Sequence, residues 1–189
     1  IYGMEIPLAA CGIVMKTNAI LLAVIIGISQ GTQPIVGFNY GAEKYDRVIS
    51  VYKLAILCNL VVSFIGFIAF QFFPNQIISI FGSGDALYYE FAVKFMRTFL
   101  FMVVLNGVQL ISSNFFAAIG KPIKGLILSM TRQVIFLIPL IIILPLFFGL
   151  NGILFAAPVA DFIAFITTTA VVSKELKIIK NKEIKLSTN

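Results

Sequence analysis

Two ionisable side chains lie inside long apolar stretches of this chain, where they could bind or transfer charge. Asp161 stands near the middle of residues 152–172, and Arg132 stands inside residues 125–148. If these stretches cross a bilayer, a charge at the centre costs about 2.5–3.5 kcal/mol and needs a partner, water or an ion. We therefore consider two roles for Asp161: a structural ion pair with a base such as Arg132 or Arg97, and a proton or cation site. Arg132 could instead extend back to the polar interface.

Uncharged polar side chains form a second pattern, in the apolar stretch 99–119. Asn106, Gln109 and Ser113 follow one another at spacings of three and four residues, which place them on one face of a helix. Polar groups on membrane helices commonly hydrogen-bond to neighbouring helices, and each such bond contributes less than about 2 kcal/mol. The alternative interpretation is that this face lines a water-filled cavity.

The residue types present give little support to catalytic chemistry. The chain has no histidine, which excludes Ser-His-Asp and Cys-His catalysis within it and removes the commonest metal ligand. Cys11 and Cys58 both lie in apolar runs, without the spacing of a disulfide framework or a zinc site. We therefore predict no enzymatic activity, no metal site and no cofactor, and we expect no nucleic-acid partner.

Small residues and one proline recur in the first long apolar run. Two G-x-x-x-G motifs are present, one at Gly27 and Gly31 and one at Gly37 and Gly41. This spacing lets two helix backbones approach closely. Pro34 lies between the motifs and removes a backbone donor, which predicts a kink. We interpret these five positions as determinants of helix geometry and movement, not as contacts to a substrate.

Long apolar blocks must position these groups. Hydrophobic residues make up 60% of the chain and charged residues 12%, whereas soluble domains average about 45–50% and about 25%. A helix needs about 20 residues to cross the hydrocarbon core, and open strands would leave backbone groups unpaired there. A soluble protein could not cover five such helices. The predicted fold is an all-α polytopic membrane helix bundle with five transmembrane helices, at about residues 6–38, 48–73, 90–119, 123–147 and 151–173.

Basic residues are distributed unevenly between the two sides of this five-span topology. Most lysines and arginines fall near residues 39–48, near residues 119–124 and in the tail 174–189, and the positive-inside rule places these segments in the cytoplasm. The predicted localisation is the cell membrane, with the N-terminal end extracellular and the C-terminus cytoplasmic. The tail is predicted to be a frayed extension of the last helix. In the outward segment 74–90, Asp85 is predicted to cap the helix that follows.

The order and spacing of these motifs resemble one known family. Two segments carry the resemblance, GISQGTQPIVGFNYGAEKYDRV and FFAAIGKPIKGLILSMTRQVIFLIPLIIILPLFFGLNGILFAAPVADFIA. They are similar to the C-terminal lobe of multidrug and toxin extrusion (MATE) transporters, with MepA-like and DinF-like members nearest. The resemblance implies a twelve-helix exporter with two six-helix lobes, in which residues 1–173 correspond to helices eight to twelve. Helix seven and the N-terminal lobe would then be partners of this chain.

The resemblance also implies a mechanism, in which inward movement of H⁺ or Na⁺ drives lipophilic organic cations outward by alternating access. The acids that bind the coupling ion in helices one and seven of the family lie outside this chain, and the core of span 90–119 has no carboxylate, so the choice of ion stays open. Asp161 is the candidate ion or proton contact. The candidates for the substrate cavity are Met15, Asn18, Gln30, Gln33, Asn106, Gln109 and Asn114.

Two other functions are compatible with the same residues. A related flippase or exporter of lipid-linked or anionic metabolites would favour a basic cavity, so the positions of Lys16, Arg97 and Arg132 discriminate it from an exporter of cations. A membrane scaffold without transport activity would pair all its polar faces.

Overall fold

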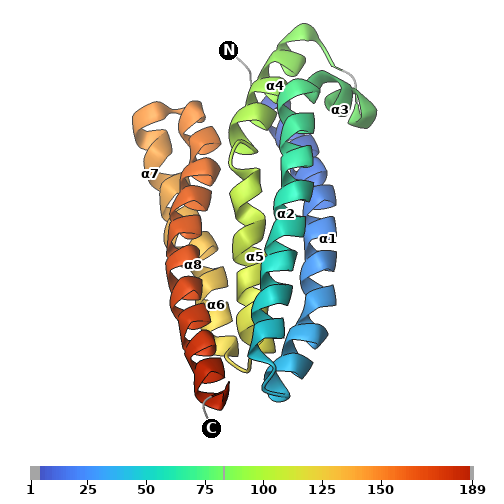
Figure 1. Cartoon of the computed structure of the whole chain (residues 1–189). Helices are drawn as coiled ribbons and strands as arrows, with labels where there is room; N and C mark the ends of the chain where they lie inside the picture. Colours follow the sequence, from blue (N-terminus) through green and yellow to red (C-terminus); the bar gives the residue numbers. More distant parts are fainter. Residues whose placement is uncertain (1–4, 83, 188–189) are drawn as a thin grey trace.

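The computed structural model describes residues 5–82 and 84–187, and this part of the chain folds into helices joined by short connections. Figure 1 shows long helices packed along one another, with α1, α2 and α5 side by side and α6 to α8 forming a second group. The predicted all-α membrane helix bundle is therefore confirmed. The elements are α1 (Glu5–Gly41), α2 (Tyr45–Phe72), α3 (Pro74–Phe81), α4 (Ala86–Phe99), α5 (Val103–Ala118), α6 (Pro122–Met130), the π-helix η1 (Thr131–Leu137), α7 (Ile138–Phe148) and α8 (Leu150–Ser187).

Four of the described segments are long and apolar enough to cross a membrane, and a bent pair of helices supplies a fifth. The four are Glu5–Gly41, Tyr45–Phe72, Pro122–Phe148 and Asn151–Leu186. The first passes through Lys16, Thr17 and Asn18 without a break. Its 37 residues correspond to about 55 Å of helix, more than the roughly 30 Å of hydrocarbon.

The fifth span is broken where the sequence predicts a continuous helix over 90–119. Helices α4 and α5 meet at an angle of 47°. The break contains neither glycine nor proline; instead, the amide of Phe101 donates to the carbonyl of Thr98 and that of Val103 to Leu100, three residues back. This tighter register accompanies the turn of the chain. At the start of α4, Asp85 accepts from the amide of Tyr88 at 2.9 Å, which confirms the predicted cap.

Two apolar cores stabilise the bundle, one toward each end. One core joins α1 and α4 through residues such as Val14, Phe91 and Met96. The other core, which includes Val48 and Phe116, joins α1, α2, α5 and α8. Many large apolar side chains point outward instead, and none of the residues of α7 is buried. Apolar side chains on the outside are compatible with lipid, because lipid tails are equally apolar and exert no hydrophobic force that would bury these side chains.

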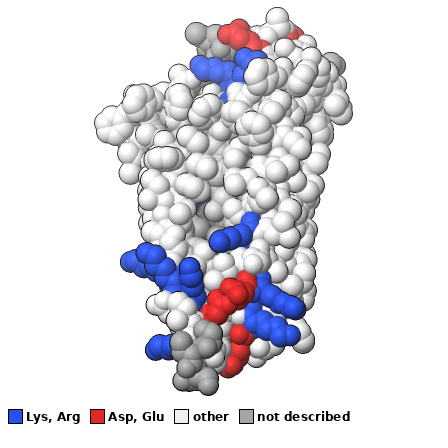
Figure 2. All heavy atoms as spheres, in the orientation of Figure 1, with Lys and Arg blue, Asp and Glu red and all other residues white. Residues whose placement is uncertain are grey.

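Helix α8 extends through the predicted basic tail as far as Ser187. Glu175 and Ile179 are fully buried on this extension. Figure 2 shows basic and acidic side chains gathered around the same end of the molecule, below a broad uncharged surface. The extension is thus packed onto the bundle and is not frayed, which corrects the prediction for the described part of the tail.

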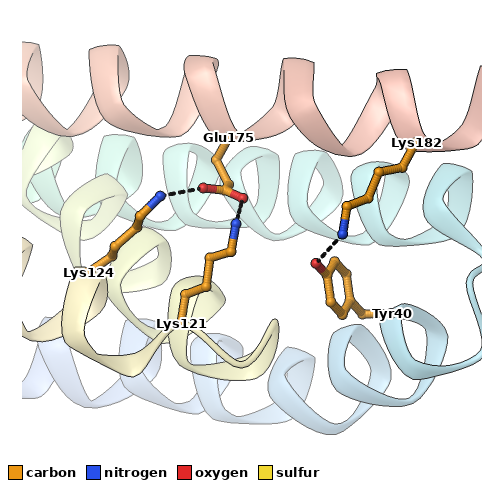
Figure 3. A network of polar contacts seen from close by, with 5 residues as sticks. All are labelled: Tyr40, Lys121, Lys124, Glu175 and Lys182. Atoms are coloured by element: carbon orange, nitrogen blue, oxygen red, sulfur yellow. Dashed lines mark hydrogen bonds and ion pairs between the residues drawn. The ribbon is translucent and has the colours of Figure 1, made fainter.

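A polar network fixes this extension to the rest of the chain (Figure 3). The Glu175 carboxylate accepts from Lys121, at the end of the α5–α6 connection, and from Lys124 of α6 at 2.9 Å. Further along α8, Lys182 donates to the Tyr40 hydroxyl at 3.3 Å. The network therefore ties three parts of the sequence together at the basic end.

Replacing Lys121 and Lys124 together by Ala is expected to destabilise the protein by more than the sum of the two single replacements. Each single change leaves the other lysine on Glu175 and should cost about 1 kcal/mol or less. The double change leaves a carboxylate that is 2% exposed without a counter-charge, which costs about 3 kcal/mol. Thermal unfolding of the purified variants checks this, with Lys174→Ala combined with Lys177→Ala as the charge-matched control. Additive losses would contradict it.

Candidate functional site

A small polar pocket lies between α5 and the α6–η1 segment, inside the apolar part of the bundle. Its volume is about 70 Å³. The pocket is lined by all three residues that the sequence places on one face of a helix, Asn106, Gln109 and Ser113. The opposite wall contains Ser129, Arg132 and Gln133. The pocket is therefore polar on both walls.

A hydrogen bond from a side chain of α5 to the backbone of α6 connects the two walls of the pocket. Gln109 is 5% exposed, and its Nε2 donates to the carbonyl oxygen of Leu128 at 2.5 Å. The two backbones approach closely beside this bond, because a Cβ added at Gly125 would overlap the carbonyl oxygen of Ser113. The Ser113 hydroxyl is buried and has no hydrogen-bond partner among the described residues. Its unused donor and acceptor are available to a small polar occupant.

Arg132, on the α6–η1 wall of the pocket, also forms an ion pair with a residue of α8. Arg132 Nε lies 2.5 Å from Asp161 Oδ1, and the two side chains are 18% and 4% exposed. The pair joins η1 to α8, so of the interpretations open in the sequence, the geometry matches pairing of Asp161 with Arg132. Arg132 does not extend back to the interface.

The backbone at Arg132 departs from a regular α-helix. Residues Thr131–Leu137 form a π-helix, at whose end the amide of Ile138 donates to the carbonyl of Gln133, five residues back. The next residue, Pro139, has no amide proton with which to restore the α register. Such π-turns re-aim side chains and recur at functional sites. Here the π-turn contains both Arg132 and Gln133, which line the pocket.

The other cavity candidates lie away from this pocket. Asn114 donates from Nδ2 to the Ser29 hydroxyl at 2.7 Å and so joins α5 to α1. Asn18 has a buried side-chain oxygen without a hydrogen-bond partner in the described chain. Met15 and Gln30 are exposed on α1, and Gln33 is half-buried. The seven candidates therefore divide into a pocket pair, Asn106 and Gln109, and a set on or against α1.

The glycines of α1 contact little within this chain. A Cβ added at Gly27, Gly31 or Gly41 would meet no atom within 4 Å, whereas one at Gly37 would lie 3.4 Å from the carbonyl oxygen of Ala118. Helix α1 continues through Pro34 as one element. Only Gly37 of these four glycines therefore allows a close approach inside the described structure.

Three features of the described structure escaped the sequence patterns. Ser129 and Gln133 line the pocket from a segment whose apolar composition hid them, and the π-turn has no recognised sequence signal. Asn59, on α2, is fully buried and lies so close to Gly107 of α5 that a Cβ there would overlap its Oδ1. Asn59 is a polar residue within an apolar helix, and this pattern could have predicted a contact with another helix. Within residues 5–82 and 84–187, no three His, Cys, Asp or Glu side chains are grouped to hold a metal ion.

Comparison with known proteins gives a consistent assignment. The sequence profile of the MatE family matches residues 4–143. The multidrug export protein MepA of Staphylococcus saprophyticus is 23% identical over 171 residues, which are 90% of this chain and 37% of that protein. A protein of Shewanella oneidensis described as an FAD transporter is 24% identical over 153 residues, 81% of this chain and 34% of that protein.

Solved structures share the arrangement of helices. The MATE multidrug transporter DinF-BH, solved as a complex with a small molecule, superposes with a TM-score of 0.80 and 35% identity over 86% of this chain and 36% of its own. An outward-facing multidrug resistance MATE family transporter superposes with a TM-score of 0.87 and 20% identity, over 95% of this chain and 41% of its own. The chain thus spans between a third and about two fifths of the length of these proteins.

Proposed function

The chain belongs to the MatE family of membrane transporters, and we propose that it forms part of one lobe of a cation-coupled multidrug exporter. The observation that carries the proposal is the polar pocket of about 70 Å³ that Asn106, Gln109 and Arg132 line within an otherwise apolar bundle. The 35% identity to DinF-BH, a multidrug transporter, supports the same function. The activity belongs to the whole transporter, of which this chain supplies five spans.

The proposed mechanism is alternating access, in which two lobes rock around a central cavity. The exposed face of α1 is the surface in this chain that fits the lobe boundary, because Gly27, Gln30 and Gly31 all lie on it without neighbours to bury them. Met15, exposed on the same helix, offers a soft thioether to lipophilic cations of varied shape. The buried pair on α5, Asn106 and Gln109, then contributes polar contacts deeper in the lobe.

The coupling ion is proposed to be H⁺ or Na⁺. Asp161 is the acid of this chain nearest the pocket, and any ion that bound it would compete with Arg132, which already lies 2.5 Å from Oδ1. This geometry favours a structural role for Asp161 and leaves ion binding mainly to the other lobe. The positive-inside rule supports a cytoplasmic position in the cell membrane for the basic end that contains Lys121, Lys124 and Lys182.

One observation favours a second candidate, the export of an anionic metabolite. Arg132 contributes a positive charge to the pocket, and a relative with 24% identity is described as an FAD transporter. A guanidinium binds phosphate and carboxylate groups well. The engagement of Arg132 by Asp161 weakens this alternative, because the charge of the base is largely neutralised within the pair.

Transport by the intact transporter in proteoliposomes tests the proposal. A proton or Na⁺ gradient is imposed, and movement of a fluorescent organic cation and of a flavin nucleotide is followed in parallel. Gradient-dependent movement of the cation supports the leading function. Movement of the flavin nucleotide alone would replace it with the second candidate, and movement of neither would refute both.

Replacing Gly31 by Leu is expected to impair transport without lowering folding stability. A Cβ added at Gly31 would meet no atom of the described chain within 4 Å, so the free energy of unfolding should change by less than about 0.5 kcal/mol. At a lobe boundary the same side chain would block close approach of a partner helix. Uptake rates and thermal unfolding are measured together, with Ile20→Leu, on the exposed surface of α1, as the control. Full transport activity in the Gly31→Leu variant would place this face outside the lobe boundary.

A further inference from the structure

A groove lies on the outside of the bundle between α2 and α8, with α5 as its floor. Its volume is about 370 Å³, and it is distinct from the polar pocket, with which it shares no lining residue. We propose that this groove binds one acyl chain of an anionic phospholipid, while Lys53 contacts the phosphate of the headgroup. The site would hold a lipid of the leaflet next to the basic end of the molecule.

The groove has the length and chemistry of an acyl-chain site. On α8 it extends from Phe165 to Leu176, about 16 Å at 1.5 Å per residue. One leaflet contributes about 15 Å of hydrocarbon, half of the 30 Å core. Its remaining apolar walls are supplied by Ile56 and Leu60 of α2 and by Leu105 of the floor. An extended hydrocarbon chain could therefore lie along the whole groove.

Lys53, the charged residue of the lining, lies toward one end of the groove, whereas Thr169, near its middle, is polar but uncharged. Tyr52 and Lys53 of α2 stand at that end opposite Ser173 of α8, whereas Leu60 and Phe165 line the other end. The Tyr52 hydroxyl is already bonded to Ser112 at 2.8 Å. Lys53 is exposed, and none of the ion pairs found in the described chain includes it. Lys53 is therefore the cation at this end that remains available to a ligand.

The depth of Lys53 indicates an anionic partner. It lies on α2 about 9 Å deeper along the helix axis than Arg47, at 1.5 Å per residue. A lysine at this depth extends its ammonium group toward the interface, where lipid phosphates lie. Basic groups surround the same end of the molecule (Figure 2), and each lysine near an anionic membrane surface contributes about 1 kcal/mol of attraction. Charge complementarity thus selects an anionic headgroup over a zwitterionic one.

A second protein helix fits the groove less well than an acyl chain. Interfaces between membrane helices are enriched in small residues that let backbones approach. The lining of this groove contains no glycine or alanine, and it includes large side chains such as Phe165, Leu105 and Leu176. A flexible acyl chain fits between such side chains more readily than a second helix does.

Lipid titration of the intact transporter in detergent, read by native mass spectrometry, tests the site with phosphatidylglycerol and phosphatidylcholine as probes. Lys53→Ala removes the headgroup contact, and Lys44→Ala removes the same charge outside the groove. Thr169→Phe fills the groove, and Leu57→Phe adds similar bulk to the exposed surface of α2 outside it. Thermal unfolding in lipid-free detergent is measured for all four variants, since each altered side chain is exposed and should leave the fold intact.

The expected result is tighter binding of phosphatidylglycerol than of phosphatidylcholine by the unmodified protein. Lys53→Ala should weaken phosphatidylglycerol binding about fivefold, which corresponds to about 1 kcal/mol, and leave phosphatidylcholine binding unchanged. Thr169→Phe should weaken both, and the two control variants neither. Equal binding of the two lipids, equal losses in Lys44→Ala and Lys53→Ala, or no loss in Thr169→Phe would each overturn the proposal.

Discussion

Replacing Arg132 by Gln is expected to lower the free energy of unfolding by about 3–5 kcal/mol, because it leaves a buried carboxylate without its counter-charge. Asp161 lies on α8, is 4% exposed and takes its counter-charge from Arg132 of η1. Replacing the other partner, Asp161→Asn, should lower the free energy of unfolding by less. Arg132 is 18% exposed, so its long side chain can extend toward the interface once the carboxylate is gone. The two halves of one ion pair should therefore differ in cost.

Thermal unfolding in detergent measures both variants, with Lys44→Gln as a control for loss of one positive charge. The combined variant Arg132→Met with Asp161→Leu should recover part of the stability lost in Arg132→Gln, since it removes the buried charge together with its partner. Equal losses in Arg132→Gln and Asp161→Asn would contradict this explanation. Transport adds a second readout: if Asp161→Asn lowers expression but leaves coupled transport intact, the role of Asp161 is structural.

Replacing Gly125 by Leu should separate α5 from α6 and open the polar pocket. The first added atom would overlap the carbonyl oxygen of Ser113, and a backbone atom cannot move aside as a side chain can. Overpacking of this kind costs about 1–3 kcal/mol. Separation of the helices would also lengthen the 2.5 Å bond from Gln109 to Leu128, worth about another 1 kcal/mol. The combined loss should be among the largest for any single residue of the bundle.

Thermal unfolding and transport of Gly125→Leu are compared with those of Gly31→Leu, which introduces the same side chain where nothing lies within 4 Å. Gly125→Leu should lose stability and transport, whereas Gly31→Leu should lose transport alone. A stable Gly125→Leu variant with wild-type activity would mean that the close α5–α6 approach is not needed.

Much of the fold was accessible from composition and periodicity. Few charges and long apolar blocks leave helices in lipid as the one arrangement that satisfies every backbone group, and the structure agrees. The shared face of Asn106, Gln109 and Ser113 also followed from helical spacing, since residues three and four apart must lie on one side of a helix. These inferences succeed because they depend on local geometry and on the surrounding medium alone.

The partners of the polar groups could not be inferred in the same way. The spacing predicts a polar face on α5 but not that Arg132 and Gln133 stand opposite, because a π-turn in another helix re-aims those side chains. The bend between α4 and α5 occurs without glycine or proline. Of the four G-x-x-x-G glycines, three have no atom of the described chain within 4 Å of an added Cβ, whereas Gly107 and Gly125, outside any such motif, approach neighbouring helices closely.

Composition, charge distribution and helical period were thus sufficient for the membrane bundle and for the shared polar face of α5, but not for buried polar groups such as Asn59 and Glu175. Other features depend on contacts between helices that are remote in sequence. They are the ion pair of Arg132 with Asp161, the ion pairs of Glu175 with Lys121 and Lys124, and the groove beside Lys53. The physical reason is that the amino-acid pattern of one helix specifies which groups must avoid lipid, whereas the packing of several helices specifies which groups come into contact.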